Sequence, residues 1–384
     1  MNSSKPAQRE YSIDLLRILS MLMIVSLHSL SHGGIITLAG DVNVYGIYFH
    51  CVYSLCILSV NVYVLISGYF LINQIFRTSK LLKLIAETLF YAWLIVGVRV
   101  LMHDTPGMGD VFKSILPISF NFYWFISAYI IMFILSPVIN KAVLMLNQRQ
   151  HLSLIIVSVL VFSLWSDIIP FSAPMGLSGR GTDVVWFIVL YLIGAYIRRY
   201  VGVVDKKKSL GGALLCCSLL VITWLAIIGI LSVRDMGLDR DHYVFASNFY
   251  FKYNSLLSLG GSVCLFLFFR NMTVNGFWGT RVIKFIAPLT LGIYLIHDNP
   301  LVREYVWSGL IKIEELTPVL PLYVMIYVLF VFIAGIFIDV IRKYILCAYT
   351  NTKIYKGLLE RIDLKTESIF EKCLNKYINQ NSNF

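Results

Sequence analysis

Long apolar stretches, separated by short polar segments, follow one another along most of the chain. A helix needs about 20 apolar residues to cross a bilayer core, and about ten stretches approach or exceed that length. They are 13–31, 51–72, 82–102, 122–144, 152–170, 184–201, 209–232, 249–269, 283–301 and 319–341. The pattern predicts an all-α, polytopic integral membrane protein with about ten transmembrane helices.

Lysine and arginine are distributed unevenly between the polar segments. Most of the 32 lysines and arginines fall on one side of the membrane if the N-terminus is placed in the cytoplasm. Because positive residues favour the cytoplasmic side, both termini are predicted to be cytoplasmic, in a multi-pass protein of the cell (inner, cytoplasmic) membrane. The first apolar stretch is too long for a signal peptide and lacks a cleavage site, so it is expected to stay as the first span.

The composition narrows the class of protein further. Of the 384 residues, 58% are hydrophobic and 14% are charged, whereas soluble domains carry about 25% charged residues. The net charge of +11 comes from cations in the polar segments and is accompanied by no nucleic-acid-binding motif, so no nucleic acid is expected as a partner. The cysteines make no zinc-like spacing with histidine, and no metal is expected. Glycine-rich phosphate loops, zincin motifs and serine-hydrolase elbows are absent.

Two regions are predicted along the chain, a transmembrane domain over residues 1–344 and a basic tail over residues 345–384. Apolar residues recur in the tail at helical spacing among lysines: Ile354, Leu358, Ile362, Ile369, Phe370, Leu374 and Tyr377. Such an amphipathic helix is expected to lie along the inner leaflet, with membrane lipids as partners. A soluble regulatory helix is the alternative.

The first stretch contains an arginine and a histidine at positions where ionisable residues are costly. Arg17 and His28 are eleven residues apart and therefore lie on nearly the same helix face, about 16 Å apart along the axis. Asp14 is placed to pair with Arg17. Ionisable groups within a span usually face protein or water and serve a function. The structural alternative is an arginine that extends to the interface and a histidine satisfied by a neighbouring helix.

The sequence YSIDLLRILSMLMIVSLHS, with an arginine, ten residues and a histidine, resembles the opening helix of membrane-bound acyltransferase family 3. Four later segments resemble that family in the same order. They are NVYVLISGYFL (Asn61–Leu71), NFYWFISAYIIMFILSPVIN (Asn121–Asn140), WFIVLYLIGAYIR (Trp186–Arg198) and LTLGIYLIH (Leu289–His297). The resemblance covers residues 11–297, which is most of the chain.

The resemblance implies transfer of an acyl group, most often acetyl, from cytoplasmic acyl-CoA (acetyl-CoA) to a hydroxyl or amine of a saccharide or lipid-linked glycan. A sugar hydroxyl needs a base as it attacks the thioester, and His28 is the candidate. A covalent acyl-histidine is the other route, and the sequence does not separate the two. Arg17 is expected to hold the phosphate or pantetheine end of the donor, and so to belong to both the catalytic and the donor-binding sets.

Further residues are assigned to the two substrates. The donor site is expected to include Ser67, Arg77, Lys80 and Lys83, although this basic group has more lysines than the arginine-rich version usual in the family, and its residues would also be explained by the positive-inside rule. The acceptor site is expected to include Asn121, Tyr123, Trp124, His297 and Asp298. The alternative for the aromatic residues is the interfacial belt, and for His297 an interfacial position.

Two other classes of protein compete with this interpretation. A glycan or lipid-linked-sugar transporter would use the same arginine and histidine to line a polar pathway, but it would more often show internal repeats or broken helices in two halves. A glycan polymerase would be expected to carry a large outer loop rich in arginine. Lys252 and Arg99 rank below His297 as site candidates. The other histidines, His32, His50, His103, His151 and His242, fall in or beside polar segments and receive no role.

Overall fold

The computed structural model describes residues 10–39, 42–104, 106–168, 180–233 and 251–381. Every regular element in these ranges is helical. The first half contains α1 (Tyr11–Ser31), α2 (Ile35–Leu38), α3 (Val44–Cys56), α4 (Leu58–Leu71), α5 (Thr78–Leu101), α6 (Met108–Ile115), α7 (Trp124–Met145), α8 (Gln148–Val159), a π-helical turn (Leu160–Leu164) and α9 (Trp165–Ile168). The second half contains α10 (Val184–Tyr200), α11 (Lys206–Val233), α13 (Leu256–Arg270), α14 (Phe277–Ile286), a 3₁₀ turn (Ala287–Leu289), α15 (Thr290–His297), α16 (Arg303–Ile311), α17 (Leu320–Thr350) and α18 (Lys353–Asn381).

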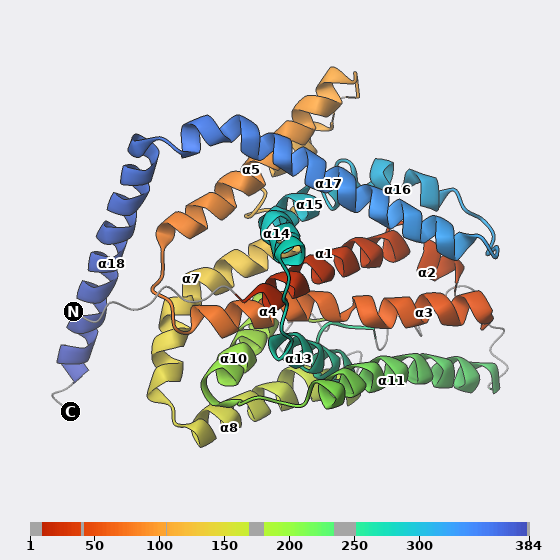
Figure 1. Ribbon diagram of the computed structural model, residues 1–384, viewed down its shortest axis with the longest axis horizontal. Coiled ribbons are helices and arrows are strands. Elements are labelled where there is room, and N and C mark those ends of the chain that lie inside the picture. The colour runs from red at the N-terminus through yellow and green to blue at the C-terminus, as the bar shows by residue number, and fades with distance from the viewer. Residues whose placement is uncertain (1–9, 40–41, 105, 169–179, 234–250, 382–384) are drawn as a thin grey trace.

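The predicted all-α membrane architecture is confirmed. Within the described ranges, eight helices or consecutive helix pairs are long and apolar enough to cross a membrane. The other two predicted spans correspond to α10 and α13, which are 17 and 15 residues long. Figure 1 shows α1, α3, α4 and α11 running in roughly the same direction, whereas α18 is steeply inclined to them.

Several predicted boundaries differ from the observed helices. The second span begins at Val44 rather than residue 51, because the Asn43 side chain accepts hydrogen bonds from the first turn and starts α3 there. In the eighth, residues 249 and 250 lie outside the described part of the chain, and from residue 251 onward the helix begins at Leu256, where Ser255 caps α13. The last span, predicted over 319–341, continues to Thr350. Apolar periodicity locates spans well, but side-chain caps set their ends.

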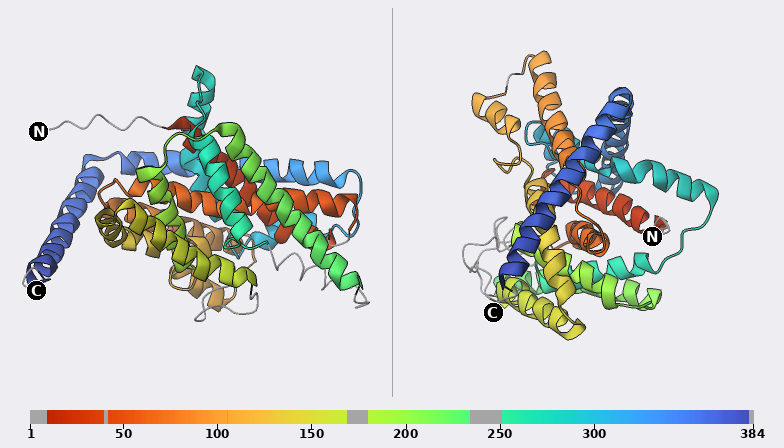
Figure 2. Two further views of the ribbon diagram at one scale, coloured as in Figure 1. Left: turned by 90° about the horizontal axis from the view of Figure 1, so that it is seen from below. Right: turned by 90° about the vertical axis from the view of Figure 1, so that its left-hand side faces the viewer.

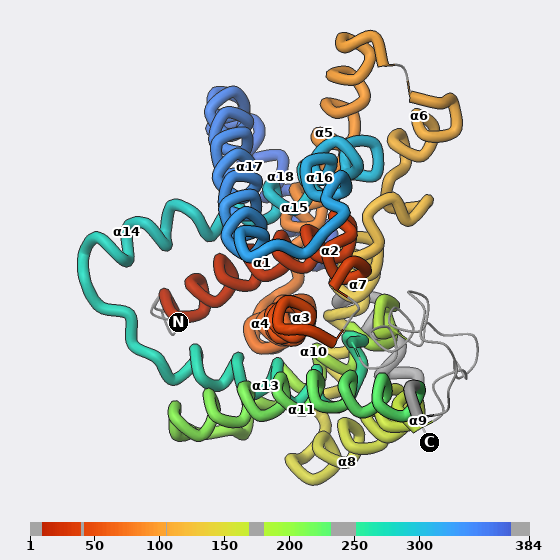
Figure 3. The backbone as a smooth tube through the Cα atoms, turned by 90° about the vertical axis from the view of Figure 1, so that its right-hand side faces the viewer, coloured from red at the N-terminus to blue at the C-terminus, as the bar shows by residue number. Residues whose placement is uncertain are grey.

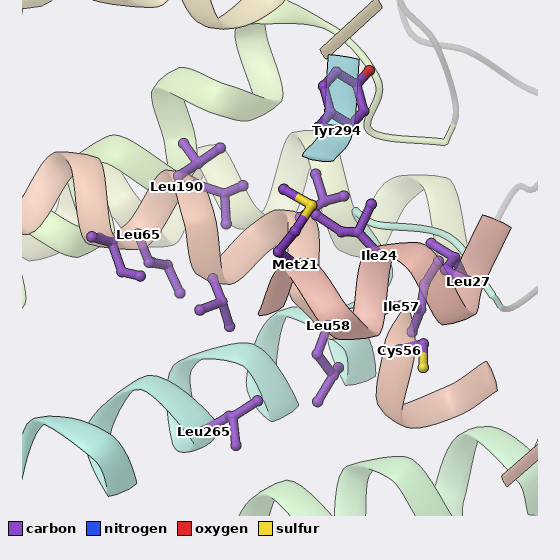
Figure 4. Close-up of a cluster of buried hydrophobic side chains, with 14 of the residues drawn as sticks. Met21, Ile24, Leu27, Cys56, Ile57, Leu58, Leu65, Leu190, Leu265 and Tyr294 are labelled. Carbon is purple, nitrogen blue, oxygen red and sulfur yellow. The ribbon is translucent and has the colours of Figure 1, made fainter. Parts of the chain in front are cut away.

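Helix α1 lies at the centre of the bundle. It packs against α3, α4, α15 and α17, and Figure 3 shows it between α17 and the α3–α4 pair. Part of the apolar core appears in Figure 4, where Met21 and Ile24 of α1 gather near Leu58 of α4. Because α1 is central, Asp14 and His28 are buried and Arg17 is partly buried.

Helices α4 and α10 pack unusually closely. A Cβ added at Gly68 of α4 would collide with the backbone of Tyr191, and one at Gly194 of α10 would collide with the backbone of Leu65. Small residues allow two membrane helices to approach in this way. The packing gives a physical reason for the glycines in the SGYF and LIGAY segments.

A buried cluster of charges joins α17 to α5. The carboxylate of Asp339 accepts hydrogen bonds from the Tyr91 hydroxyl at 2.7 Å and from Nε of Arg342 at 2.6 Å. Arg342 also contacts Glu87 of α5 at 2.8 Å. Gly292 of α15 packs directly on this carboxylate, with no room for a Cβ. The cluster therefore fixes α15, which carries His297, against α17 and α5.

The C-terminal helix α18 crosses one end of the bundle, as the right-hand view of Figure 2 shows. Both carboxylate oxygens of Asp363 accept hydrogen bonds from Ser79 at the start of α5, one from its backbone N–H and one from its hydroxyl, each at 2.7 Å. Thr366 pairs with Thr78 on the same turn. The side chains of Phe370, Leu374 and Tyr377 lie outside the described part of the chain. Placement along the inner leaflet stays a prediction.

Candidate active site

Two internal chambers adjoin each other beside α1. The first, here called the His28 chamber, has a volume of about 260 Å³ and is lined by Met21, His28 and Tyr294, among others. The second, here called the Lys80 chamber, has a volume of about 610 Å³ and is lined by Glu10 and Lys80, among others. The chambers share the lining residues Arg17, Ile66, Ser67, Leu84 and Tyr129. Arg17 lines both chambers and His28 lines the first, so both residues face cavities that share part of their lining.

Arg17 lies at the neck between the two chambers. Its guanidinium contacts the carboxylate of Asp14 at 2.9 Å, which confirms the expected pair, and it lies 5.5 Å from the ring centre of Phe70. The Tyr63 hydroxyl donates a hydrogen bond to the Arg17 backbone carbonyl at 2.9 Å. About a third of the side chain is exposed, at 34%, so the guanidinium is accessible to a ligand in the chambers.

The residues expected to bind the donor fall into two groups. Ser67 lines both chambers, with its hydroxyl 3.1 Å from that of Tyr129, and Lys80 lines the Lys80 chamber. Arg77 precedes the first residue of α5, and Lys83 is exposed. Neither Arg77 nor Lys83 is among the described residues that line the two chambers.

His28 meets His297 at the deep end of the His28 chamber. Nδ1 of His28 lies 3.0 Å from Nε2 of His297, and Nδ1 of His297 lies 2.6 Å from the carbonyl oxygen of Ile293. Both imidazoles are buried. Residues that are 269 positions apart in the sequence, each predicted as a site residue, are thus in direct contact.

Asp298 is the charged centre of this group. One of its carboxylate oxygens lies 3.6 Å from Nδ1 of His28, 3.6 Å from Nε2 of His32 and 2.9 Å from the guanidinium of Arg303. The carboxylate is buried, with 2% of the side chain exposed. A negative charge is therefore held beside His28 and is balanced by a cation on its other side.

Sequence reasoning missed two members of this group. His32 received no role because it follows the apolar stretch, yet it lies four residues after His28 and so on the same helix face. That spacing was the available signal. Arg303 received no role either, because no local pattern in the sequence connects it to Asp298.

The remaining acceptor-site candidates occupy different environments. Trp124 lines the His28 chamber and stacks on Tyr253 at 5.6 Å. Tyr123 is buried, and its hydroxyl is used by two partners, donating to the Leu295 carbonyl at 2.9 Å and accepting from Asn299 at 2.6 Å. Asn121 is exposed and has a positive φ of 52°, which suits the turn before α7.

One set of donor atoms is compact enough to hold a metal ion. Ligand atoms of His28, His32 and Asp298 lie within 4.8 Å of one another. The guanidinium of Arg303 already contacts the same carboxylate, and its positive charge opposes a metal cation there. The group therefore fits proton chemistry better than metal binding.

Two of the other histidines and two cations that the sequence placed within spans have local partners. His50 stacks on Trp224 at 3.6 Å, and His151 contacts the Leu192 carbonyl at 3.1 Å. Lys252 pairs with Asp167 at 3.2 Å, and Arg99 pairs with Asp104 at 2.8 Å. His103 is exposed, and His242 lies outside the described residues.

The fold and the site define a multi-pass helical membrane protein in which an arginine and a histidine on one helix share an internal chamber. A family model described as an acyltransferase domain matches residues 10–339. The chain therefore belongs to acyltransferase family 3 and is a membrane acyltransferase. Curated proteins and solved structures yielded no match.

Proposed function

We propose that the protein transfers an acyl group, most simply acetyl, from cytoplasmic acyl-CoA to a hydroxyl of a surface or lipid-linked saccharide. The observation that carries the proposal is that Arg17 and His28 line one chamber, which adjoins a larger one. We further propose that the protein lies in the cell (inner) membrane with both termini in the cytoplasm. A saccharide acceptor and a role in polysaccharide biosynthesis follow from the family resemblance.

The two chambers suit the two ends of coenzyme A. The phosphates would bind in the Lys80 chamber, where Lys80 and Arg17 supply positive charge. The narrow pantetheine arm would pass Arg17 and carry the thioester toward His28, about 16 Å along α1. Holding the donor in this way aligns the thioester with the base before reaction. Arg77 and Lys83 would contribute through the local field rather than from the chamber lining.

His28 acts in this proposal as a general base. The acceptor hydroxyl gives its proton to the imidazole while its oxygen attacks the thioester carbon. The carbon–sulfur bond then breaks, and the departing thiolate takes the proton back from the imidazolium. Asp298, 3.6 Å from His28, stabilises the positive charge that His28 carries between these steps.

The acceptor would approach the His28 chamber beside Trp124, whose ring supplies an apolar face suited to a sugar. Tyr123 and Asn299 would hold the neighbouring backbone of α15 in place. Asn121, on the turn before α7, would contact the saccharide outside the chamber. Membrane lipids would surround the bundle and support α18.

Mass spectrometry of surface glycans tests the proposal. A strain that lacks the protein is complemented with wild type, His28→Ala or the control His103→Ala, which changes an exposed histidine. We expect an acyl mass increment on glycan with wild type and His103→Ala, and its loss with His28→Ala at equal protein level. Unchanged acylation with reduced glycan export would favour the transporter and overturn the proposal.

A further inference from the structure

We infer that His297 is a positioning residue that fixes the tautomer of His28, so that the proton of the neutral imidazole is on Nδ1 and the lone pair is on Nε2. This inference rests on the proposed function, because it assigns which nitrogen of His28 acts as the base. It also gives His297 a role different from contact with the acceptor. The Ile293 carbonyl, His297 and His28 form a chain in which the hydrogen-bonding role of each group sets that of the next.

The chain begins at a group that can only accept. The carbonyl oxygen of Ile293 lies 2.6 Å from Nδ1 of His297, so that nitrogen carries a hydrogen and donates it. In a neutral imidazole the other nitrogen then has no hydrogen and accepts. Nε2 of His297 therefore accepts from Nδ1 of His28, 3.0 Å away.

Asp298 favours the same proton position independently. Its carboxylate oxygen lies 3.6 Å from Nδ1 of His28, and an ionised carboxylate can only accept. Arg303 contacts the same carboxylate at 2.9 Å and supplies a fixed positive charge. A second proton on His297 is therefore not needed to balance Asp298. His297 is buried, and burial disfavours its charged form, so His297 is expected to be neutral.

The consequence concerns the free nitrogen of His28. With Nδ1 donating to His297, Nε2 holds the lone pair, and no hydrogen bond to a described residue engages it. His28 lines the His28 chamber, and the inference therefore assigns this lone pair to a hydroxyl bound there. The opposite tautomer would present an N–H to the substrate and could not accept its proton.

Solid-state ¹⁵N NMR tests the tautomer directly and without an activity assay. Wild type, His28→Gln, His297→Gln and His297→Leu are labelled with ¹⁵N,¹³C-histidine in lipid nanodiscs, and the signal absent from His28→Gln identifies His28. We expect the Nδ1–H pattern in wild type and in His297→Gln, whose amide oxygen can accept from Nδ1. In His297→Leu only Asp298 still favours Nδ1–H, from 3.6 Å and therefore beyond hydrogen-bond distance, so we expect a mixture of the Nδ1–H and Nε2–H patterns. An Nε2–H pattern in wild type, or no change in His297→Leu, overturns the inference.

Kinetics separate positioning from a merely structural role. We expect His297→Leu to lower kcat by about 100-fold, within the range that general-base catalysis contributes, with little change in KM for acyl-CoA. His297→Gln should recover at least about a tenth of the wild-type kcat, because it restores an acceptor. Equal loss in both variants overturns the inference. If wild type shows the Nδ1–H tautomer but transfers no acyl group, the proposed function fails while the tautomer assignment stands.

Discussion

The guanidinium of Arg17 lies 2.9 Å from the carboxylate of Asp14, three residues earlier on α1. The pair holds the cation at the neck between the two chambers and partly balances its charge before a ligand binds. Because Asp14 is buried and Arg17 is partly exposed, the accessible member of the pair is the cation. An anionic donor would therefore meet positive charge at the neck.

Arg17→Ala should raise KM for acyl-CoA about tenfold or more, because one charge-assisted contact is worth about 1.5–3 kcal/mol. KM for acyl-CoA in Arg17→Lys should lie between the values for wild type and Arg17→Ala, since lysine keeps the charge but loses the planar donor set. Initial rates with purified protein in nanodiscs measure this effect. Lys207→Ala, which removes an exposed cation at the start of α11, is the control. An unchanged KM in Arg17→Ala would contradict donor binding at the neck.

The close packing of α4 on α10 predicts a stability difference between two glycines. Gly68→Ala should destabilise the protein by about 1–3 kcal/mol, because the new methyl group collides with the Tyr191 backbone and the helices must separate. Gly97→Ala in α5 meets no atom within 4 Å and should be neutral or slightly stabilising. Thermal unfolding of both variants in detergent makes the comparison. Equal melting temperatures would disprove the close contact.

The charge cluster between α17 and α5 predicts a large effect of Asp339→Ala. Removing this carboxylate leaves the buried Tyr91 hydroxyl without its acceptor and leaves Arg342 with Glu87 as its remaining carboxylate partner, at a cost of about 1–3 kcal/mol. Asp110→Ala breaks an exposed pair with Lys113 and should change stability by less than about 1 kcal/mol. Chemical unfolding monitored by tryptophan fluorescence measures both. Similar small effects would mean that the cluster does not hold the helices together.

The contact between α18 and α5 predicts that Asp363 restrains the C-terminal helix. Asp363→Ala removes two acceptors from the start of α5, where a carboxylate typically contributes about 1 kcal/mol. We expect faster proteolysis at the break between α17 and α18, residues 351–352, in this variant than in wild type. Asp363→Asn, which keeps one acceptor, should fall between them. Cleavage rates that do not change would show that α18 is held by other contacts.

Much of the architecture follows from the sequence because membrane spans require long apolar stretches. The helical spacing of eleven residues placed Arg17 and His28 on nearly one face of α1, and the structure adds that both line one chamber. Contacts between distant helices do not follow from periodicity, since an apolar pattern does not specify which helices are neighbours. The meeting of His28 with His297 could therefore be found only in three dimensions.

Side-chain roles were harder to predict than positions. Tyr123 was expected to face the acceptor, and its hydroxyl is instead engaged with Leu295 and Asn299, a pairing that no spacing in the sequence reveals. Lys80 and Lys83 are equivalent in charge, but of these two only Lys80 is among the residues that line the Lys80 chamber. Whether these residues bind substrate stays a prediction.

The burial of Asp298 at the deep end of the His28 chamber has a consequence for the permeability barrier of the membrane. An enzyme that admits substrates from two aqueous compartments must avoid joining them into an ion-conducting pore. Here the fixed cation of Arg17 opposes the entry of cations at the neck, and the packed group of His297, Asp298 and Trp307 fills the space beyond His28 with buried side chains. On the proposed function, the residues that move the proton would also separate the two sides of the membrane, and opening this group would be expected to let ions leak across it.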